Sequence, residues 1–168
     1  NKPQPRVTEL NRRYWDGVDA GRIVLQHCLN RACRRAVFYP RVCCPYCQHA
    51  ELEWREAAGT GRVMSPSTIH RTHHDGFNDE APYVFAAVEL AEGVLVYAQL
   101  PGAPVDGESL IGRAVRADFV PHGPSRRMLV FRIADAWGQS CARAWISCPR
   151  TRLPAPSRSS RVWWRGST

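Results

Sequence analysis

Cysteine side chains are concentrated in one short stretch, HCLNRACRRAVFYPRVCCPYC (27–47), which holds five of the seven cysteines of the 168-residue chain. Cys44 and Cys47 form a C-x2-C pair. Ten residues separate Cys44 from Cys33, which forms a wider C-x4-C pair with Cys28. Two short-spaced pairs of thiolates are typical of a tetrahedral Zn²⁺ site, and four thiolates leave no coordination position for a substrate. The spacing therefore predicts structural zinc held by these four cysteines.

Other interpretations of the cluster stay open. Cys43 is a spare thiol beside the C-x2-C pair, and His27 and His49 flank the cluster as substitute ligands. The same four sulfurs could hold a single iron, with similar geometry. The remaining alternative is a set of buried or free thiols without a metal.

The second group of chemically active side chains lies in IHRTHHDGFNDEAP (69–82). A solvated loop between two strands is the favoured interpretation, because polar residues collect in such loops. A second metal site built from His70, His73, His74 and Asp75 is the alternative. No Ser/His/Asp or Cys/His signature is present, so the sequence does not predict an independent catalytic centre.

Strand-like composition marks the elements that follow the cysteine cluster. Five segments rich in β-branched and aromatic residues alternate with segments rich in turn residues. Without a convincing long helix between them, they predict a five-stranded, closed or nearly closed antiparallel barrel. The five segments are 60–72, 83–90, 93–100, 113–120 and 127–134.

A short helix is predicted before the cluster, over residues 8–20, with Thr8 as its N-cap and Gly21 at its end. Its apolar residues recur at helical spacing: Leu10, Tyr14, Trp15 and Val18. The whole chain then divides into a helical segment (1–21), a metal ribbon (22–56), a barrel (57–134) and a tail (135–168).

The net charge of +8 is unevenly distributed along the chain. Residues 135–168 carry six arginines against Asp135, which leaves only a mildly basic body before them. This tail is rich in Ser, Pro and Arg without periodicity, so we expect it to be disordered. The sequence has no long apolar run and no apolar leader at its start, so we expect a cytoplasmic protein without a membrane span.

An ordered set of short motifs resembles a known family. The set is YWDGVDAGRIVLQHC, FYPR, CPYC, LEW, GTGRV, IHR, GF, APYVFAAVEL, EG and VFR, over about residues 9–134. It resembles the acyl-CoA-associated OB-fold family, long catalogued as domain of unknown function number thirty-five. The family carries a rubredoxin-like zinc ribbon before the OB-fold barrel. Its first knuckle is usually C-x2-C followed by Gly, whereas here the pair is two residues wider and Arg34 follows it.

This resemblance implies a non-catalytic accessory subunit. Family members resemble partners of thiolase-like condensing or retro-aldol enzymes, or of hydratase-like enzymes, in lipid, steroid and polyketide metabolism. By resemblance, the chain would bind an acyl-CoA thioester, the enzyme that holds it, or both, with zinc in a structural role.

Recognition of CoA requires cations for its phosphates and an aromatic or apolar surface for its adenine. Arg71 and Phe77 are the first candidates for these roles, followed by Arg41 and His70. Each arginine taken singly is more often a surface charge, and Phe77 has core packing as its alternative.

Two other functions are consistent with the same elements. Zinc ribbons and OB-folds both occur in proteins that bind single-stranded nucleic acid, but segments 83–90 and 93–100 contain no positive charge. The third interpretation is a pure interaction scaffold, in which a barrel edge or the N-terminal helix, with Tyr14 and Trp15, contacts an enzyme without touching CoA.

Overall fold

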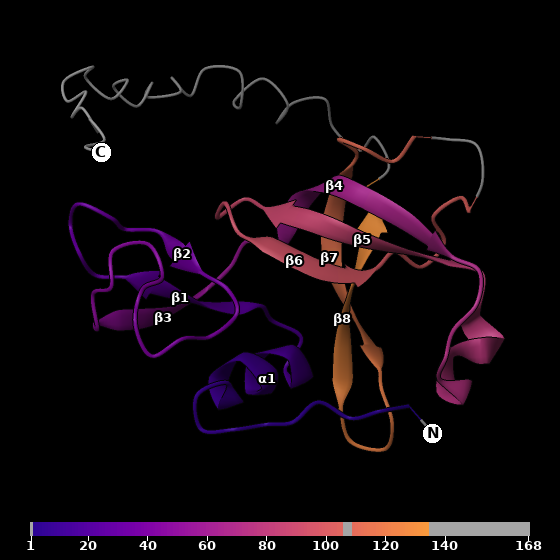
Figure 1. The fold of residues 1–168 in the computed structure, drawn as a ribbon, viewed down its shortest axis with the longest axis horizontal. Helices are drawn as coiled ribbons and strands as arrows, with labels where there is room; N and C mark the ends of the chain where they lie inside the picture. The colour runs from indigo at the N-terminus through magenta and orange to yellow at the C-terminus, as the bar shows by residue number, and fades with distance from the viewer. Residues whose placement is uncertain (1, 106–108, 135–168) are drawn as a thin grey trace, which may run out of the picture. The chain divides into compact units, whose positions relative to one another are not determined.

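The computed structural model describes residues 2–105 and 109–134. One α-helix, one 3-10 helix and eight strands follow one another within these ranges (Figure 1). In chain order they are α1 (Arg12–Asp19), β1 (Val24–Cys28), β2 (Ala36–Val37), β3 (Leu52–Glu56), β4 (Thr60–Ile69), η1 (Asp75–Glu80), β5 (Tyr83–Leu90), β6 (Leu95–Gln99), β7 (Ala114–Pro121) and β8 (Arg127–Ile133). The tail predicted to be disordered, 135–168, lies outside the described residues.

Helix α1 begins later than predicted and without the predicted cap. Its first residue is Arg12, and Asn11 precedes it without a side-chain capping hydrogen bond. The Asn11 side chain instead accepts the backbone N–H of Thr8 at 2.7 Å, so Thr8 belongs to the turn before the helix. Its predicted end is confirmed, because Gly21 adopts a φ of 76°, the left-handed conformation that terminates helices.

The apolar face of α1 is packed against the body, as its spacing predicts. Tyr14 and Val18 are buried, and the Tyr14 ring contacts the rings of Trp15, Phe38 and Tyr39 at centroid distances of 5.1–5.7 Å. The helix contacts β1 and β8, as Figure 1 shows. Tyr14 is therefore a packing residue, whereas contact of the N-terminal helix with a partner enzyme stays a prediction.

Strands β1, β2 and β3 form a three-stranded antiparallel sheet in the order β2-β1-β3. Gln26 lies at its centre, paired with Val37 on one side and Trp54 on the other. Side chains of the central strand, β1, pack into two different clusters. Leu25 packs in the barrel core, and Cys28 packs in the cysteine cluster.

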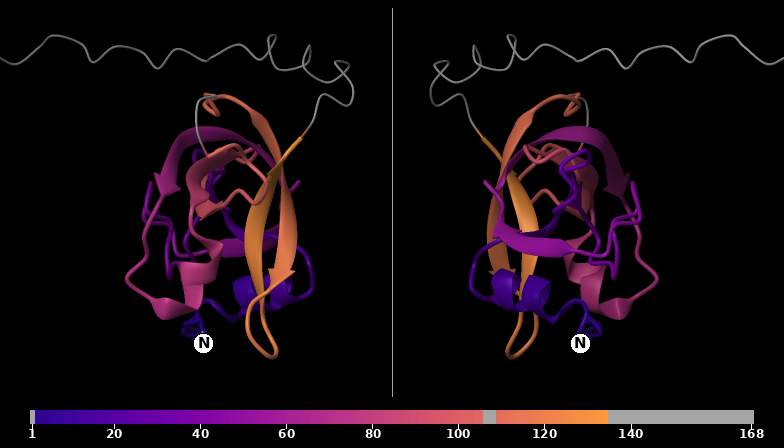
Figure 2. Two further views of the ribbon diagram at one scale, coloured as in Figure 1. Left: turned by 90° about the vertical axis from the view of Figure 1, so that its right-hand side faces the viewer. Right: turned by 90° about the vertical axis from the view of Figure 1, so that its left-hand side faces the viewer.

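The other five strands close into a barrel in the order β4-β5-β6-β8-β7, which confirms the predicted five-stranded barrel. The predicted antiparallel pairing holds for four of the five neighbouring strand pairs, but β6 and β8 pair in parallel at Gln99 and Val130. The reason is parity: an odd number of strands cannot alternate in direction all the way round a closed ring. Figure 2 shows the long β7–β8 hairpin that completes the ring.

Close approach of strands requires glycine at one point of the barrel. Gly61 pairs with Leu90 of β5 and with Val115 of β7. A Cβ atom at Gly61 would lie 2.5 Å from the carbonyl oxygen of Glu89. Any other residue would therefore push β4 away from β5 at the point where β4 has a partner on both sides.

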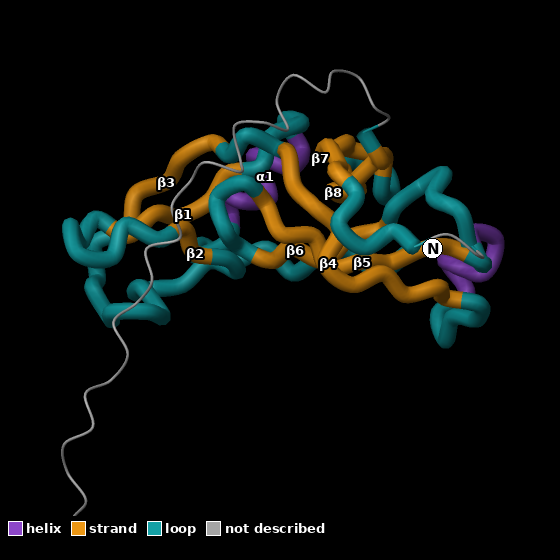
Figure 3. The backbone as a smooth tube through the Cα atoms, turned by 90° about the horizontal axis from the view of Figure 1, so that it is seen from above, coloured by secondary structure: helices purple, strands orange, loops and turns teal. Residues whose placement is uncertain are grey.

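The barrel core consists of aliphatic side chains that alternate along the strands. In β5 the inward positions are Val84, Ala86, Val88 and Leu90, and the side chains between them are more exposed. Ile23, Leu25 and Ala36 of the ribbon region belong to the same buried cluster. In Figure 3 the three-stranded sheet and the barrel are seen from above. Within the described ranges, no helix has the length and apolarity needed to cross a membrane.

Candidate metal centre and barrel-end pocket

The four predicted cysteine ligands converge on one point. The Sγ atoms of Cys28 and Cys47 are 3.5 Å apart, and those of Cys33 and Cys44 are 3.7 Å apart. All four sulfurs lie within 4.8 Å of one another. A tetrahedral ion with Zn–S bonds of about 2.3 Å would set its sulfurs about 3.8 Å apart. The geometry of the donor set therefore fits Zn²⁺, whereas Cys43 does not belong to the group.

Two similar backbone turns carry these cysteines. The N–H of Gln48 donates to the carbonyl of Cys44 at 2.8 Å, and the N–H of Arg34 donates to the carbonyl of Asn30 at 3.0 Å. Gln48 and Arg34 both adopt left-handed conformations, with φ of 60° and 51°. In the first knuckle (Cys28–Arg34), Asn30 thus occupies the turn position that Cys44 has in the second knuckle (Cys44–Gln48). The sulfur of Cys28, two residues earlier, supplies the ligand, which explains the wide C-x4-C spacing.

The Asn30 side chain stabilises this wider turn. Its Oδ1 accepts the N–H of Ala32 at 2.9 Å, and its Nδ2 lies 3.7 Å from the Sγ of Cys47, as a donor to that sulfur. An amide donor to sulfur favours the thiolate form. Asn30 therefore connects the backbone of the first knuckle with a ligand of the second.

Backbone amides also polarise the sulfurs. Burial opposes ionisation of Cys44, but hydrogen bonds from the amides of Tyr46 and Cys47 lower the pKa of its thiol to about 7. Burial raises the pKa of the Cys28 thiol to about 12, and the neighbouring thiols add to this increase. Because zinc binds the thiolate forms, metal binding must release protons from such a cluster.

The histidine-rich loop does not form a metal site. Among the described residues, the four cysteines are the one group of three or more His, Cys, Asp or Glu side chains that converges. His70 and His73 are exposed. The Nδ1 of His74 accepts the N–H of Gly76 at 3.1 Å and so caps η1. The alternative of a second metal site in this loop is therefore wrong.

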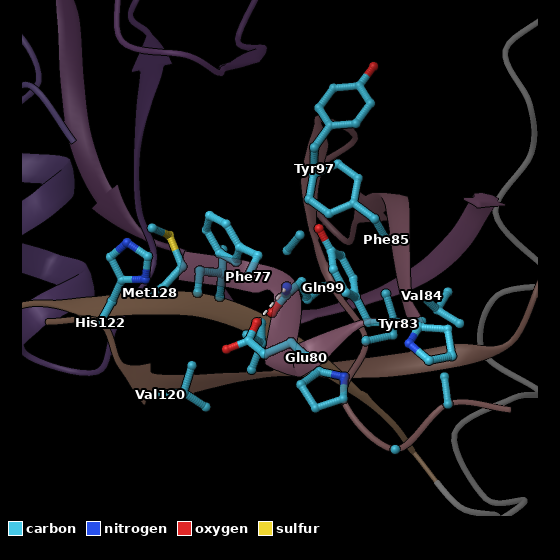
Figure 4. A pocket seen from close by; sticks show the side chains of 18 of the residues that line it. Phe77, Glu80, Tyr83, Val84, Phe85, Tyr97, Gln99, Val120, His122 and Met128 are labelled. Carbon is cyan, nitrogen blue, oxygen red and sulfur yellow. Dashed lines mark hydrogen bonds between the residues drawn. The ribbon is translucent and has the colours of Figure 1, made fainter. Parts of the chain in front are cut away.

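A pocket of about 590 Å³ opens at one end of the barrel. Its wall comes from the N-terminal segment, η1, the β5 and β6 strands with the loop after β6, and the β7–β8 hairpin. Figure 4 shows Glu80 and Gln99 joined by a hydrogen bond, with Phe77, His122 and Met128 to one side and Phe85 and Tyr97 to the other. Most of the remaining wall is aliphatic, with Val84, Ala98, Leu100 and Leu129 among its residues.

Interactions within the protein engage four polar side chains of this pocket. Lys2 pairs with Glu80, and Nε2 of Gln99 donates to the same carboxylate at 3.2 Å. Burial opposes ionisation of Glu80, but the hydrogen bonds from Lys2 and Gln99 outweigh it and lower the pKa of the Glu80 carboxyl. His122 is buried, and its Nε2 lies 2.9 Å from the carbonyl oxygen of Pro3.

The four residues predicted to bind a ligand lie in different places. Phe77 lines the pocket, with Lys2 over its ring at 5.2 Å from the centroid. Arg71 and His70 are exposed residues after β4 and are not part of the pocket wall. Arg41 lies in the ribbon, where its backbone exchanges two hydrogen bonds with the Gln26 side chain. The structure therefore does not bring these four together.

Sequence reasoning missed most of the polar pocket residues. Lys2 and Glu80 are 78 positions apart, so no local pattern connects them. Gln99 had a weak signal as the polar residue near the end of an otherwise apolar strand. A separate cavity of about 350 Å³ lies on the ribbon, beside Cys28, and groups basic side chains that were not predicted together: His27, Arg31, Arg34 and Arg55.

Comparison with known proteins places these two parts in one family. Residues 15–53 match the family described as ChsH2, rubredoxin-like zinc ribbon domain, and residues 54–120 match ChsH2, C-terminal OB-fold domain. A solved structure titled Ltp2-ChsH2(DUF35) aldolase is 35% identical, with a TM-score of 0.69 over 79% of this chain and all of that one. The chain belongs to the DUF35 family.

Two curated relatives show how the family's names vary. A probable enoyl-CoA hydratase alpha subunit of Thermomonospora curvata is 35% identical over 79% of this chain and 40% of its own length. A DUF35 domain-containing scaffold protein of Methanothermobacter thermautotrophicus is 47% identical over 38% of this chain and 49% of its own length. The DUF35 chain described here thus spans half or less of these two relatives.

Proposed function

We propose that this DUF35 protein is a non-catalytic accessory subunit. Its partner would be a thiolase-superfamily or hydratase-like enzyme that acts on acyl-CoA thioesters in lipid, steroid or polyketide metabolism. The observation that carries the proposal is the match to the Ltp2-ChsH2(DUF35) aldolase structure, which extends through both the ribbon and the barrel. The name of the methanogen relative, a scaffold protein, agrees with such a role.

The side chains of the described residues support a role without chemistry of its own. The converging cysteines fit a closed site, so they leave no position for an activated water. Four polar side chains of the barrel-end pocket bond to one another or to the backbone rather than forming a nucleophile with a supporting base: Lys2, Glu80, Gln99 and His122.

Zinc would be held by Cys28, Cys33, Cys44 and Cys47. When bound, it supplies a rigid tetrahedral cross-link between the two knuckles and no reaction chemistry. The chain's own contribution is the pair of turns that aim backbone amides at the sulfurs. As ligand contacts for acyl-CoA, Arg71, Arg41 and His70 stay predictions, whereas Phe77 has the support of its place in the pocket wall.

The charge distribution disfavours the alternative of single-strand nucleic-acid binding. An OB-fold surface for a polyanion should be basic along its length. Among the described residues of the barrel-end pocket wall, Lys2 is the sole Lys or Arg, and its ammonium is paired with Glu80. The unpredicted group of arginines lies on the ribbon instead.

Co-elution of purified components tests the proposal. The full chain would be mixed separately with each thiolase-like and hydratase-like enzyme of the same organism and analysed by size-exclusion chromatography with light scattering. We expect a stable complex with one of them and no turnover of acyl-CoA by the chain alone. Turnover by the isolated chain, or an absence of any complex, would contradict the proposal. Cys44→Ser should abolish the complex, and Cys43→Ser, its matched control, should preserve it.

A further inference from the structure

The barrel-end pocket has the size of a ligand site. Small-molecule pockets usually enclose roughly 300–1,000 Å³ and are apolar with a few fixed polar groups. The pocket here is about 590 Å³. Its floor includes side chains of the buried barrel cluster, among them Val84, Ala98 and Leu129, so an apolar ligand in it would be in contact with the core.

The charges of the wall define which part of a ligand can enter. The Lys2 ammonium is engaged by Glu80, and no arginine lines the described wall. Phosphate groups would therefore find no free cation there. Gln99 and His122 already make hydrogen bonds within the protein. A ligand that fills the pocket must consequently be uncharged and mainly apolar over its buried length.

Aromatic side chains continue the apolar surface out of the pocket. Phe85 and Tyr97 are part of the wall but are 38% and 62% exposed, on the outer side of β5 and β6 (Figure 4). In the strand pairing Ala87 lies opposite Tyr97, which sets Phe85 diagonally across from it. Such neighbours are within reach of each other on a sheet face. An apolar path therefore runs from the barrel end to the surface.

From this geometry we infer that the barrel-end pocket binds the apolar acyl portion of a thioester, with the phosphates of the carrier outside it. This inference rests on the proposed function, since it assigns one part of the acyl-CoA ligand to a site. The N-terminal segment contributes to closing the pocket, because Lys2 lies over Phe77 and the Pro3 carbonyl contacts His122.

The two methionines of the chain provide a matched pair of probes. Met128 lines the pocket, whereas Met64 lies on β4 outside its wall and is 47% exposed. The full chain labelled with ¹³C at the methionine methyls would be titrated with octanoyl-N-acetylcysteamine, which has an acyl thioester and no phosphate. We expect a saturable shift of the Met128 methyl resonance and an unchanged Met64 resonance. Equal shifts of both, or a shift of neither, would overturn the inference.

Calorimetry with octanoyl-CoA, acetyl-CoA and CoA gives an independent measurement. Burial of methylene groups should increase affinity by about fourfold for each one enclosed, so octanoyl-CoA should bind much more tightly than acetyl-CoA. Met128→Trp should reduce octanoyl-CoA affinity at least tenfold by filling the pocket, and Met64→Trp should leave it unchanged. Equal binding of octanoyl-CoA and CoA would overturn the assignment even if Met128→Trp failed to fold.

Failure of this inference is distinguishable from failure of the proposed function. Complex formation with the partner enzyme is measured without any acyl ligand. If the complex forms and acyl-chain length has no effect, the pocket assignment alone is wrong. If no complex forms, or if the chain alone turns over acyl-CoA, the accessory role is wrong whatever the pocket binds.

Discussion

The ribbon and the barrel are stabilised by different interactions. In the ribbon, the cluster beside the sulfurs has three fully buried members, of which Cys28 and Cys44 are candidate ligands and Val37 is aliphatic. The barrel cluster has sixteen buried members, and Phe131 and Val63 are completely inaccessible. Stability from apolar burial scales with the area removed from water, so it is ample in the barrel and small around the sulfurs.

This difference indicates what each region depends on. A short ribbon that cannot bury enough apolar surface requires a cross-link, and four thiolates on a metal provide one. The barrel requires no metal because its own side chains fill it. The central strand β1 contributes to both the ribbon and the barrel, since Leu25 packs into the barrel cluster and Cys28 into the sulfur cluster.

Removal of the metal should unfold the ribbon and leave the barrel folded. This is the largest effect that we predict. Structural zinc contributes roughly 10–16 kcal/mol of apparent binding free energy at neutral pH. Cys44→Ser, which removes the most buried sulfur, should therefore release zinc and abolish amide-exchange protection in β2 and β3. Zinc content measures the release of the metal, and hydrogen exchange followed by mass spectrometry measures the loss of protection.

The neighbouring thiol supplies the control for this experiment. Cys43→Ser changes a cysteine outside the converging group, so zinc content and exchange protection should stay those of the parent chain. Loss of protection in β5 and β6 together with the ribbon would show that the two regions unfold as one unit, and would contradict the separation argued here.

Truncation of the largest core side chain should have the opposite pattern. Phe131 is 0% exposed within the barrel, and Phe→Ala in a core costs about 3–5 kcal/mol. Phe131→Ala should lower the free energy of unfolding of the barrel by about that amount, measured by urea denaturation, while the protein still binds zinc. Phe85→Ala is the matched control, because Phe85 is 38% exposed and its loss should cost far less. Equal costs would mean that the core is not where the barrel's stability resides.

Relief of backbone strain in the first knuckle should strengthen the ribbon modestly. Arg34 holds a φ of 51°, which costs a residue with a Cβ about 1–2 kcal/mol. Glycine removes that cost, but it also gives the unfolded chain more conformational freedom, which offsets part of the gain. Arg34→Gly should therefore stabilise the zinc-bound ribbon by a net of roughly 0.5–1 kcal/mol. Competition with a chromogenic chelator measures the change in zinc affinity. Arg34→Ala keeps the Cβ and should show no gain; an equal gain would refute the strain argument.

Local patterns in the sequence were enough to predict much of this fold. The cysteine spacing identified the four sulfurs that converge, because ligands of a knuckle lie close together in the chain. Composition identified all five barrel strands, because each half-buried strand carries its own apolar alternation. The count of five strands requires a parallel pair once the ring closes, but it does not identify β6 and β8 as that pair.

Contacts between distant parts of the chain were not predictable in the same way. The pocket depends on Lys2 meeting Glu80 and on His122 meeting the Pro3 carbonyl, across 78 and 119 positions. Thr8 has the right residue type for a helix cap, yet its backbone N–H donates to the Asn11 side chain and the helix begins at Arg12. Arg71 and Phe77 were predicted to contact the same ligand, but of the two only Phe77 lines the pocket.

The smallest expected effect is that of a surface ion pair on the β7–β8 hairpin. Arg132 donates to Asp118 with both side chains about half exposed, and this hydrogen bond lowers the pKa of the Asp118 carboxyl. A lowered folded-state pKa adds stability that is complete above the unfolded pKa, about 3.9, and is lost as pH falls through the folded value. Solvent screening limits the contribution to less than about 1 kcal/mol.

Asp118→Asn should therefore cost under about 1 kcal/mol at pH 7 in urea denaturation, and the difference from the parent chain should vanish in acid. High salt should weaken it as well, since an exposed pair is screened. Arg132→Gln should have the same small cost, because either change removes the one pair. A cost comparable with that of Phe131→Ala would mean that the barrel, like the ribbon, depends on a few polar contacts rather than on its buried core.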